Sequence, residues 1–114
     1  MTEPRIKTSI RVSAHIRRAE AGGAFAAIVR RGDPDAGAVA VKLYRGRGDA
    51  QMFIQSRDLD GQTVWRDPLD GRVSEAGDDI EAAIDQWLAR EISIDPDLWV
   101  IEIENPKGDA FLGD

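Results

Sequence analysis

The only histidine of the chain, His15, lies at helical spacing with three cations, and these residue types could bind phosphate or nucleic acid, or take part in catalysis. The row follows steps of four, four and three along IKTSIRVSAHIRRAEAGG: Lys7, Arg11, His15 and Arg18. On a phosphate backbone each cation would add salt-dependent affinity. However, the row has no interleaved aromatic residues and the chain carries a net charge of −6. Because this is unlike a nucleic-acid footprint, we interpret the row as a solvated helix face and keep polyanion binding as the alternative.

His15 could act as a general base, but the sequence gives it no catalytic companion. There is no second histidine and no cysteine, and no carboxylate lies at a helical spacing that would orient the imidazole. The motifs G-x-S-x-G, G-x-x-x-x-G-K-[ST], H-E-x-x-H and G-x-G-x-x-G are absent, and the acidic turns lack the ligand series of a calcium loop. We therefore expect no cofactor or metal and lean against an enzyme. A small enzyme whose site is assembled from distant carboxylates stays open.

The turn RGRGDA offers a second place for an anion. Arg45 and Arg47 flank Gly46, and glycine-rich turns can present backbone N–H groups to negative charge. Glycines at a strand turn need no functional explanation, so we interpret the segment as a hairpin connection. If it does bind, it would extend the polyanion surface of the first helix.

A third candidate is an acidic and partly apolar surface in the second half of the chain. Acidic residues of a predicted helix accompany an apolar pair in the tail: Asp78, Glu81 and Asp85 with Phe111 and Leu112. Apolar residues in a polar terminus usually dock, either on the same chain or on a partner. We expect docking on the same chain, and otherwise a partner or self-association contact.

The histidine row requires a helix beneath it. The hydrophobic period predicts one over residues 6–21, ended by Gly22-Gly23, where a left-handed cap is easy. The expected buried side is apolar or small: Ile6, Ile10, Ser13 and Ala14, widened by Val12, Ile16 and Ala19. The row of His15 would then face solvent.

Further elements follow in the order β-β-β-β-α-β. Short β-branched or aromatic runs between tight turns predict four strands, at residues 25–30, 39–45, 51–57 and 63–67. In the second of them, alternation predicts one buried and one wet face. A helix capped by Ser74 comes next. The last strand, LWVIEIEN, is apolar on both faces and therefore interior to a sheet. We expect an α+β fold in which a four-stranded antiparallel meander and a final strand carry both helices on one face.

Composition sets the broad class. A chain of 114 residues with 42% apolar and 32% charged residues is typical of one soluble globular domain over residues 1–114, with a polar tail at 106–114. The absence of cysteine excludes disulfides and fits a reducing compartment. No apolar run approaches the roughly 20 residues that span a bilayer, and the amino end lacks the apolar middle of a signal peptide. We expect a cytoplasmic protein without a membrane partner.

Charge is divided unevenly along the chain. Residues 1–47 hold ten Lys or Arg against four Asp or Glu, and residues 48–114 hold five against seventeen. Such asymmetry indicates a polyanion-binding face, an acidic interaction face, or two halves that attract each other within one fold. The third possibility is the simplest.

Two stretches carry a resemblance to a known family. The opening RIKTSIRVSAHIRRAEAGGAFAAIVRRGD and the closing DPDLWVIEIEN resemble short alphaproteobacterial proteins grouped as domain of unknown function 1491. The resemblance covers most of the chain and implies a bacterial cytoplasmic protein. It implies no catalytic or ligand residue.

From these observations we expect a small interaction or regulatory module without catalytic activity. Its partner would be another protein or a second copy of the chain. Nucleic-acid or polyanion binding through the first helix is the alternative, and the small enzyme is the second alternative.

Overall fold

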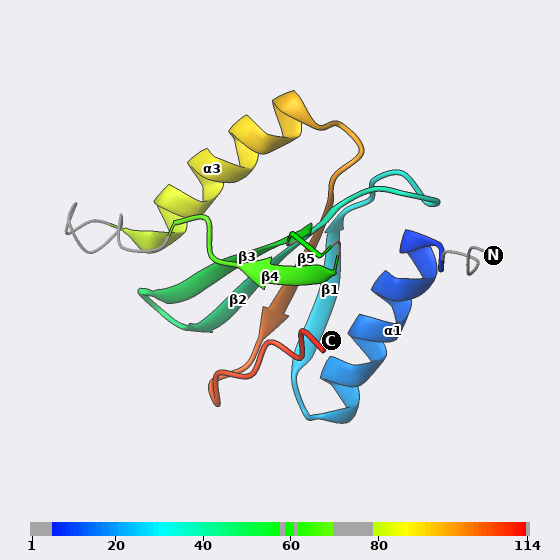
Figure 1. Cartoon of the computed structure of the whole chain (residues 1–114). Coiled ribbons are helices and arrows are strands. Elements are labelled where there is room, and N and C mark those ends of the chain that lie inside the picture. The colour runs from blue at the N-terminus through cyan, green and yellow to red at the C-terminus, as the bar shows by residue number, and fades with distance from the viewer. Residues whose placement is uncertain (1–5, 58, 61, 70–78, 114) are drawn as a thin grey trace.

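The computed structural model describes residues 6–57, 59–60, 62–69 and 79–113, and these form two helices and five strands (Figure 1). The elements are α1 (Thr8–Ala21), β1 (Phe25–Arg30), β2 (Val39–Gly46), β3 (Asp49–Arg57), β4 (Thr63–Arg66), α3 (Ile80–Ile94) and β5 (Trp99–Glu104). This order confirms the α+β class. The first helix ends as expected, since Gly23 takes a positive φ of 89° directly after the C-cap residue Gly22.

The sheet is mixed, in the order β1-β5-β2-β3-β4. The last strand, β5, lies between β1 and β2, antiparallel to β1 and parallel to β2. The predicted meander is therefore right for β2, β3 and β4 and wrong for β1. The reason is the two-sided apolar character of β5, which requires a neighbour on each edge and a cover on each face.

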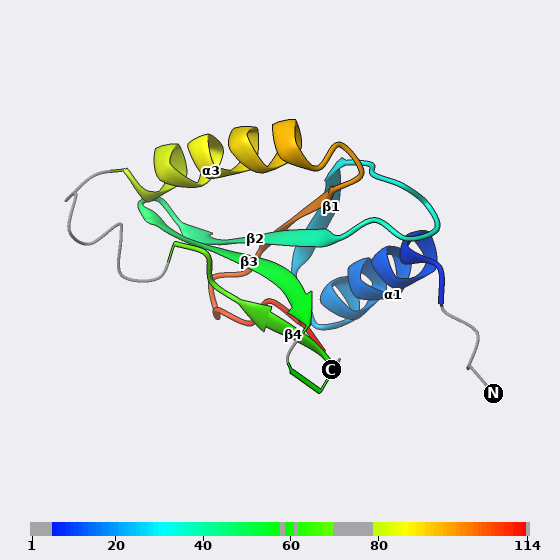
Figure 2. The same ribbon diagram turned by 45° about the horizontal axis from the view of Figure 1, so that its top comes forward.

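The two helices cover opposite faces of the sheet, as Figure 2 shows. One core lies between the sheet and α1 and contains Val41 and Ile101. The other lies between the sheet and α3 and contains Ala40, Ile84 and Val100. The expectation of both helices on one face is wrong, and so is the wet face of residues 39–45, because β2 and β5 alternate two apolar sides that both need cover.

On the face of the sheet covered by α3, the side chain of Lys42 connects β2 with α3 and β5. The Lys42 ammonium lies 3.3 Å from Glu81 Oε1 on α3 and 3.4 Å from Glu102 Oε1 on β5, and only 13% of its side chain is exposed. Burial lowers the pKa of Lys42, but the charges and hydrogen bonds of Glu102 and Glu81 outweigh burial and raise it above its ordinary value. Lys42 is therefore charged and fixes α3 on the sheet.

The connection between β1 and β2 crosses the beginning of β5 and is bonded to it. Asp33 N–H donates to the carbonyl of Asp97 at 3.0 Å, and the Trp99 indole N–H donates to the carbonyl of Asp33 at 2.7 Å. The same connection caps α1, because Thr8 N–H and Ser9 N–H donate to the carbonyls of residues 35 and 34. The connection thus fixes the amino end of α1 against the sheet.

The second helix begins with a side-chain cap from Asp79, whose Oδ1 accepts the Glu81 N–H at 3.0 Å. The predicted cap Ser74 and the site candidate Asp78 lie outside the described residues. In the described ranges, neither helix is long and apolar enough to cross a membrane.

Candidate functional site

The buried side of α1 differs from the one the apolar pattern predicts. The buried residues are Thr8, Val12, His15 and Ala19, which are spaced by four, three and four and so share one side of the helix. In contrast, the side chains of Ile6 and Ile10 are 64% and 58% exposed. The expected wet position of His15 is therefore wrong. The physical reason is that the caps from the β1–β2 connection and the contacts of His15 set the rotation of α1.

His15 is 4% exposed and bonded on one ring nitrogen. Its Nε2 lies 2.9 Å from the carbonyl oxygen of Ala110, and its ring meets Trp65 edge-on, with centroids 6.1 Å apart. Burial lowers the pKa of His15; the bond to Ala110 opposes this and the charge of Arg18 adds to it. The ring is therefore neutral at pH 7, and because a carbonyl only accepts, we assign the proton to Nε2.

The tail docks on α1, the first of the two outcomes expected for it. We call residues 105–113 the C-terminal strap. Arg18 Nη2 donates to the carbonyl of Phe111 at 3.0 Å, the Phe111 ring lies against Gly22, and Phe111 and Leu112 pack on the α1 core. His15 and Arg18 thus hold the carbonyls of two consecutive strap residues.

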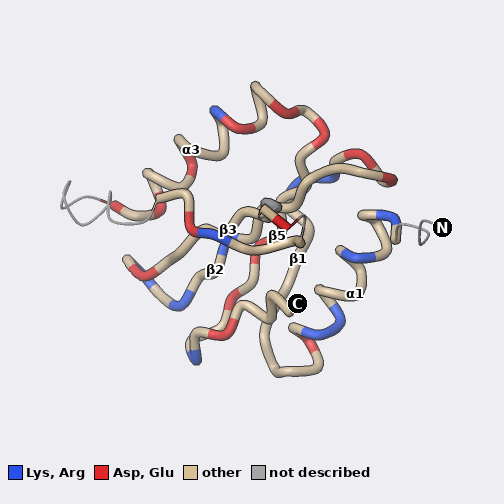
Figure 3. Tube along the Cα trace, viewed as in Figure 1, with Lys and Arg blue, Asp and Glu red and all other residues tan. Residues whose placement is uncertain are grey.

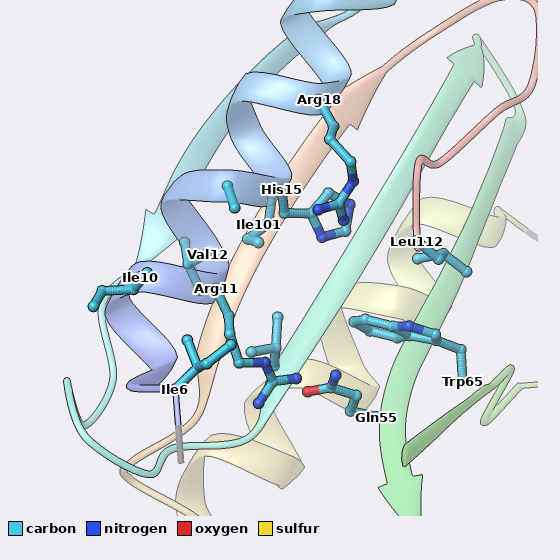
Figure 4. A pocket seen from close by; sticks show the side chains of 12 residues that line it. Ile6, Ile10, Arg11, Val12, His15, Arg18, Gln55, Trp65, Ile101 and Leu112 are labelled. Atoms are coloured by element: carbon cyan, nitrogen blue, oxygen red, sulfur yellow. The ribbon is translucent and has the colours of Figure 1, made fainter. Parts of the chain in front are cut away.

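A pocket of about 350 Å³ lies between α1, β4 and the strap (Figure 4). Its polar lining consists of Arg11, His15, Arg18, Gln55 and Trp65, and its other lining side chains are apolar and come from residues 6–14 and from β2, β5 and the strap. In Figure 4 the Arg11 guanidinium and the Gln55 amide point toward one another, while Trp65 and Leu112 form the opposite wall. None of the lining residues in the described part of the chain is Asp, Glu, Ser, Thr, Tyr or Cys.

One polar atom beside the pocket has no hydrogen-bond partner in the structure. The Trp65 indole Nε1 is buried and unbonded, which is costly for a donor. The other two tryptophans, Trp87 and Trp99, are buried in the two cores. Trp65 lies on the edge strand β4, where it is only partly buried: it packs against the α1-side core and also lines the pocket.

The other basic candidates do not join this pocket. Arg45 pairs with Asp49 at 2.9 Å, Arg47 is exposed at the β2–β3 turn, and Lys7 pairs loosely with Asp35 at 3.8 Å. Figures 1 and 2 place this turn and α1 at opposite ends of the molecule. Helix and turn therefore form no continuous basic surface.

The acidic candidates are separated from the tail. Glu81 is engaged with Lys42 and Asp85 is exposed on α3, whereas Phe111 and Leu112 lie on the α1 side of the sheet. Figure 3 shows the acidic residues of α3 and the basic residues of α1 on different sides of the molecule, so these two helices do not neutralise each other. Within the described residues, no group of three or more His, Cys, Asp or Glu could hold a metal ion.

Burial of neutral His15 predicts a pH dependence of stability. The histidine of the unfolded chain titrates near its ordinary pKa, and the folded pKa is lower. The unfolded state then binds more protons, so stability is full above pH 6.5 and falls as the pH drops through the folded pKa. We expect the free energy of unfolding of the protein to decrease between pH 7.5 and 5.5, and to decrease less in His15→Gln, which keeps an N–H donor for Ala110.

Denaturant titrations of both proteins across this pH range measure the difference. Equal slopes for the two proteins would show that His15 is not the group responsible.

The fold and pocket define a small α+β protein in which a mixed five-stranded sheet is covered by one helix on each face and a strap closes a basic-apolar pocket. The chain belongs to the family described as "Protein of unknown function (DUF1491)", whose profile matches residues 6–113. This confirms the resemblance of the opening and closing stretches.

Solved structures of relatives have the same fold. The crystal structure of a DUF1491 family protein from Caulobacter crescentus is 41% identical, with a TM-score of 0.84 over 96% of this chain and 97% of the other. An NMR structure of a DUF1491 family protein from the same organism is 40% identical, with a TM-score of 0.83 over 98% and 96%. A solution structure from A. tumefaciens is 31% identical, with a TM-score of 0.70 over 90% and 87%. No curated protein matches the chain significantly.

Proposed function

We propose that this protein is a non-catalytic binding module of the bacterial cytoplasm, in which the pocket between α1 and β4 recognises an apolar group that carries negative charge. The observation that carries the proposal is the composition of the pocket, which combines basic side chains with an apolar floor and has no acidic lining residue. Pockets that hold small ligands have this character: mostly apolar, with a few polar groups that fix orientation. The absence of cysteine suits a reducing compartment.

The surroundings of His15 support binding over catalysis. A general base activates a neighbouring hydroxyl, thiol or water and is oriented by a third group. His15 has no hydroxyl or thiol beside it in the pocket lining, and its Nε2 is committed to a backbone carbonyl. The imidazole therefore supports the strap and the wall of the pocket.

A fluorescent apolar anion tests the proposal. We expect 8-anilinonaphthalene-1-sulfonate to bind the protein saturably with a rise in fluorescence. Ala14 is exposed and lines the pocket, so Ala14→Trp should fill the space and weaken binding at least tenfold. Titration of the dye into both proteins measures the effect.

The neighbouring variant Ser13→Trp is the matched control, because Ser13 is exposed on the same helix and outside the pocket lining. It should bind the dye like the original protein, and thermal unfolding should show that both variants fold. Equal loss in the two variants, or no saturable binding to the original protein, would refute the proposed function.

A further inference from the structure

We propose that the ligand of the pocket is a free carboxylic acid with an apolar body, held with its carboxylate between Arg11 and Gln55 and its body against Trp65 and Leu112. This inference rests on the proposed function and specifies its ligand. It follows from the division of the pocket in Figure 4, where the Arg11 and Gln55 side chains meet at one end and the Trp65 and Leu112 side chains form the other wall.

The polar end suits a planar anion. A guanidinium has five N–H donors in a fixed fork and can therefore serve more than one partner at once. Guanidinium and carboxylate match in shape and can form two parallel hydrogen bonds. In Figure 4 the Gln55 amide oxygen faces Arg11, and a turn of this amide about its last bond would let Gln55 donate an N–H to the same carboxylate.

Phosphate fits this end less well. Phosphate sites in proteins use free backbone N–H groups at helix amino ends, but at the start of α1 the N–H groups of Thr8, Ser9 and Ile10 already donate to carbonyls. Arg18 is seven residues from Arg11, a rise of about 10 Å along the helix, and it is bound to the strap. His15 adds no charge because burial keeps it neutral. The one charged group at this end that we assign to the ligand is the Arg11 guanidinium, and a single positive charge suits a carboxylate monoanion better than a phosphate dianion.

The size of the pocket favours a free acid over the end of a polypeptide. Its volume of about 350 Å³ lies at the small end of ligand pockets, which measure roughly 300–1,000 Å³. Leu112 of the strap lies next to Trp65 in the wall of the pocket. The strap is fastened there through His15 and Arg18, so a long occupant would have to displace it.

Direct titration with matched probes tests the inference. The probes are 4-phenylbutyrate, its neutral amide 4-phenylbutanamide, phenyl phosphate, and the dipeptide acid N-acetyl-Leu-Phe. Binding is read from the NMR signal of the Trp65 indole N–H, assigned with Trp65→Phe. We expect the butyrate to bind at least tenfold more tightly than its amide and more tightly than the phosphate or the dipeptide.

Two charge variants locate the carboxylate. Arg11→Gln should weaken the butyrate at least tenfold and leave the amide unchanged, whereas Arg17→Gln should bind both like the original protein, because Arg17 is exposed on the same helix and outside the pocket lining. Equal binding of 4-phenylbutyrate and its amide would refute the recognition of a carboxylate. Saturable binding of the dye would in that case still support the proposed function. If phenyl phosphate binds most tightly, the ligand is not a carboxylic acid. If the dipeptide acid binds most tightly, the ligand is the end of a polypeptide and not a small free acid. A loss in Arg17→Gln equal to that in Arg11→Gln would overturn the position.

Discussion

Replacing Ile101 with alanine should lower the free energy of unfolding by about 4 kcal/mol, near the upper end of the range for removing a buried isoleucine side chain. Ile101 is fully buried at the centre of β5, opposite Ile28 of β1 and beside Val41 of β2. Strands lie on both sides and α1 lies above, so the backbone has little freedom to collapse into the space. The lost contacts and the remaining cavity then both contribute.

Ile94→Ala provides the matched control for this change. The same atoms are removed, but Ile94 is 74% exposed on α3, and exposed substitutions usually stay within about 0.5 kcal/mol. Urea titrations of the three proteins give the two differences. A loss at Ile101 below about 1 kcal/mol would contradict the central position of β5.

Gly32→Ala should lower the free energy of unfolding by about 3 kcal/mol, the upper part of the usual range for an overpacked site. A Cβ at this position would overlap the carbonyl of Asp97, and the same carbonyl lies against Gly37. The obstacle is backbone and cannot rotate away. It also accepts the Asp33 N–H, so any shift would disturb the bond that fixes the connection to β5.

Ala36→Ser serves as the control because it adds one atom to an exposed residue of the same connection. Thermal unfolding should show a large decrease for Gly32→Ala and little change for Ala36→Ser. Similar melting temperatures for the two variants would mean that the connection can move away from β5.

The positions of the helices and strands along the chain could be predicted from the sequence better than the order of the strands in the sheet. Alternation and turn residues located every described strand, and two-sided apolarity placed β5 inside the sheet. The alternation of apolar and polar residues along a strand does not indicate which strands lie next to it in the sheet. The crossing of β5 by residues 31–38 depends on hydrogen bonds of Asp33 with Asp97 and Trp99, which lie far from Asp33 in the sequence. This crossing is what separates β1 from β2.

The candidate site was partly predicted. The row of Arg11, His15 and Arg18 was singled out, and all three line the pocket. The burial of His15 was missed because Ile6 and Ile10 outrank Thr8 and His15 on any scale of hydrophobicity. The spacing of residues 8, 12, 15 and 19 was a usable signal, since small or polar residues on one side of a helix permit close packing. The contribution of Gln55 gave no signal, because it depends on the fold of β3.

The position of β5 also affects how the chain folds during its synthesis. The first strand made, β1, pairs within the sheet only with β5, the last strand. At about 5–20 residues per second, the interval between the emergence of residues 30 and 104 is roughly 4–15 s. During that time β1, with the exposed apolar side chains Phe25 and Val29, has neither of its edges paired. The nascent chain therefore presents a strand with two open edges, which chaperones or neighbouring nascent chains can reach until β5 pairs with one of them.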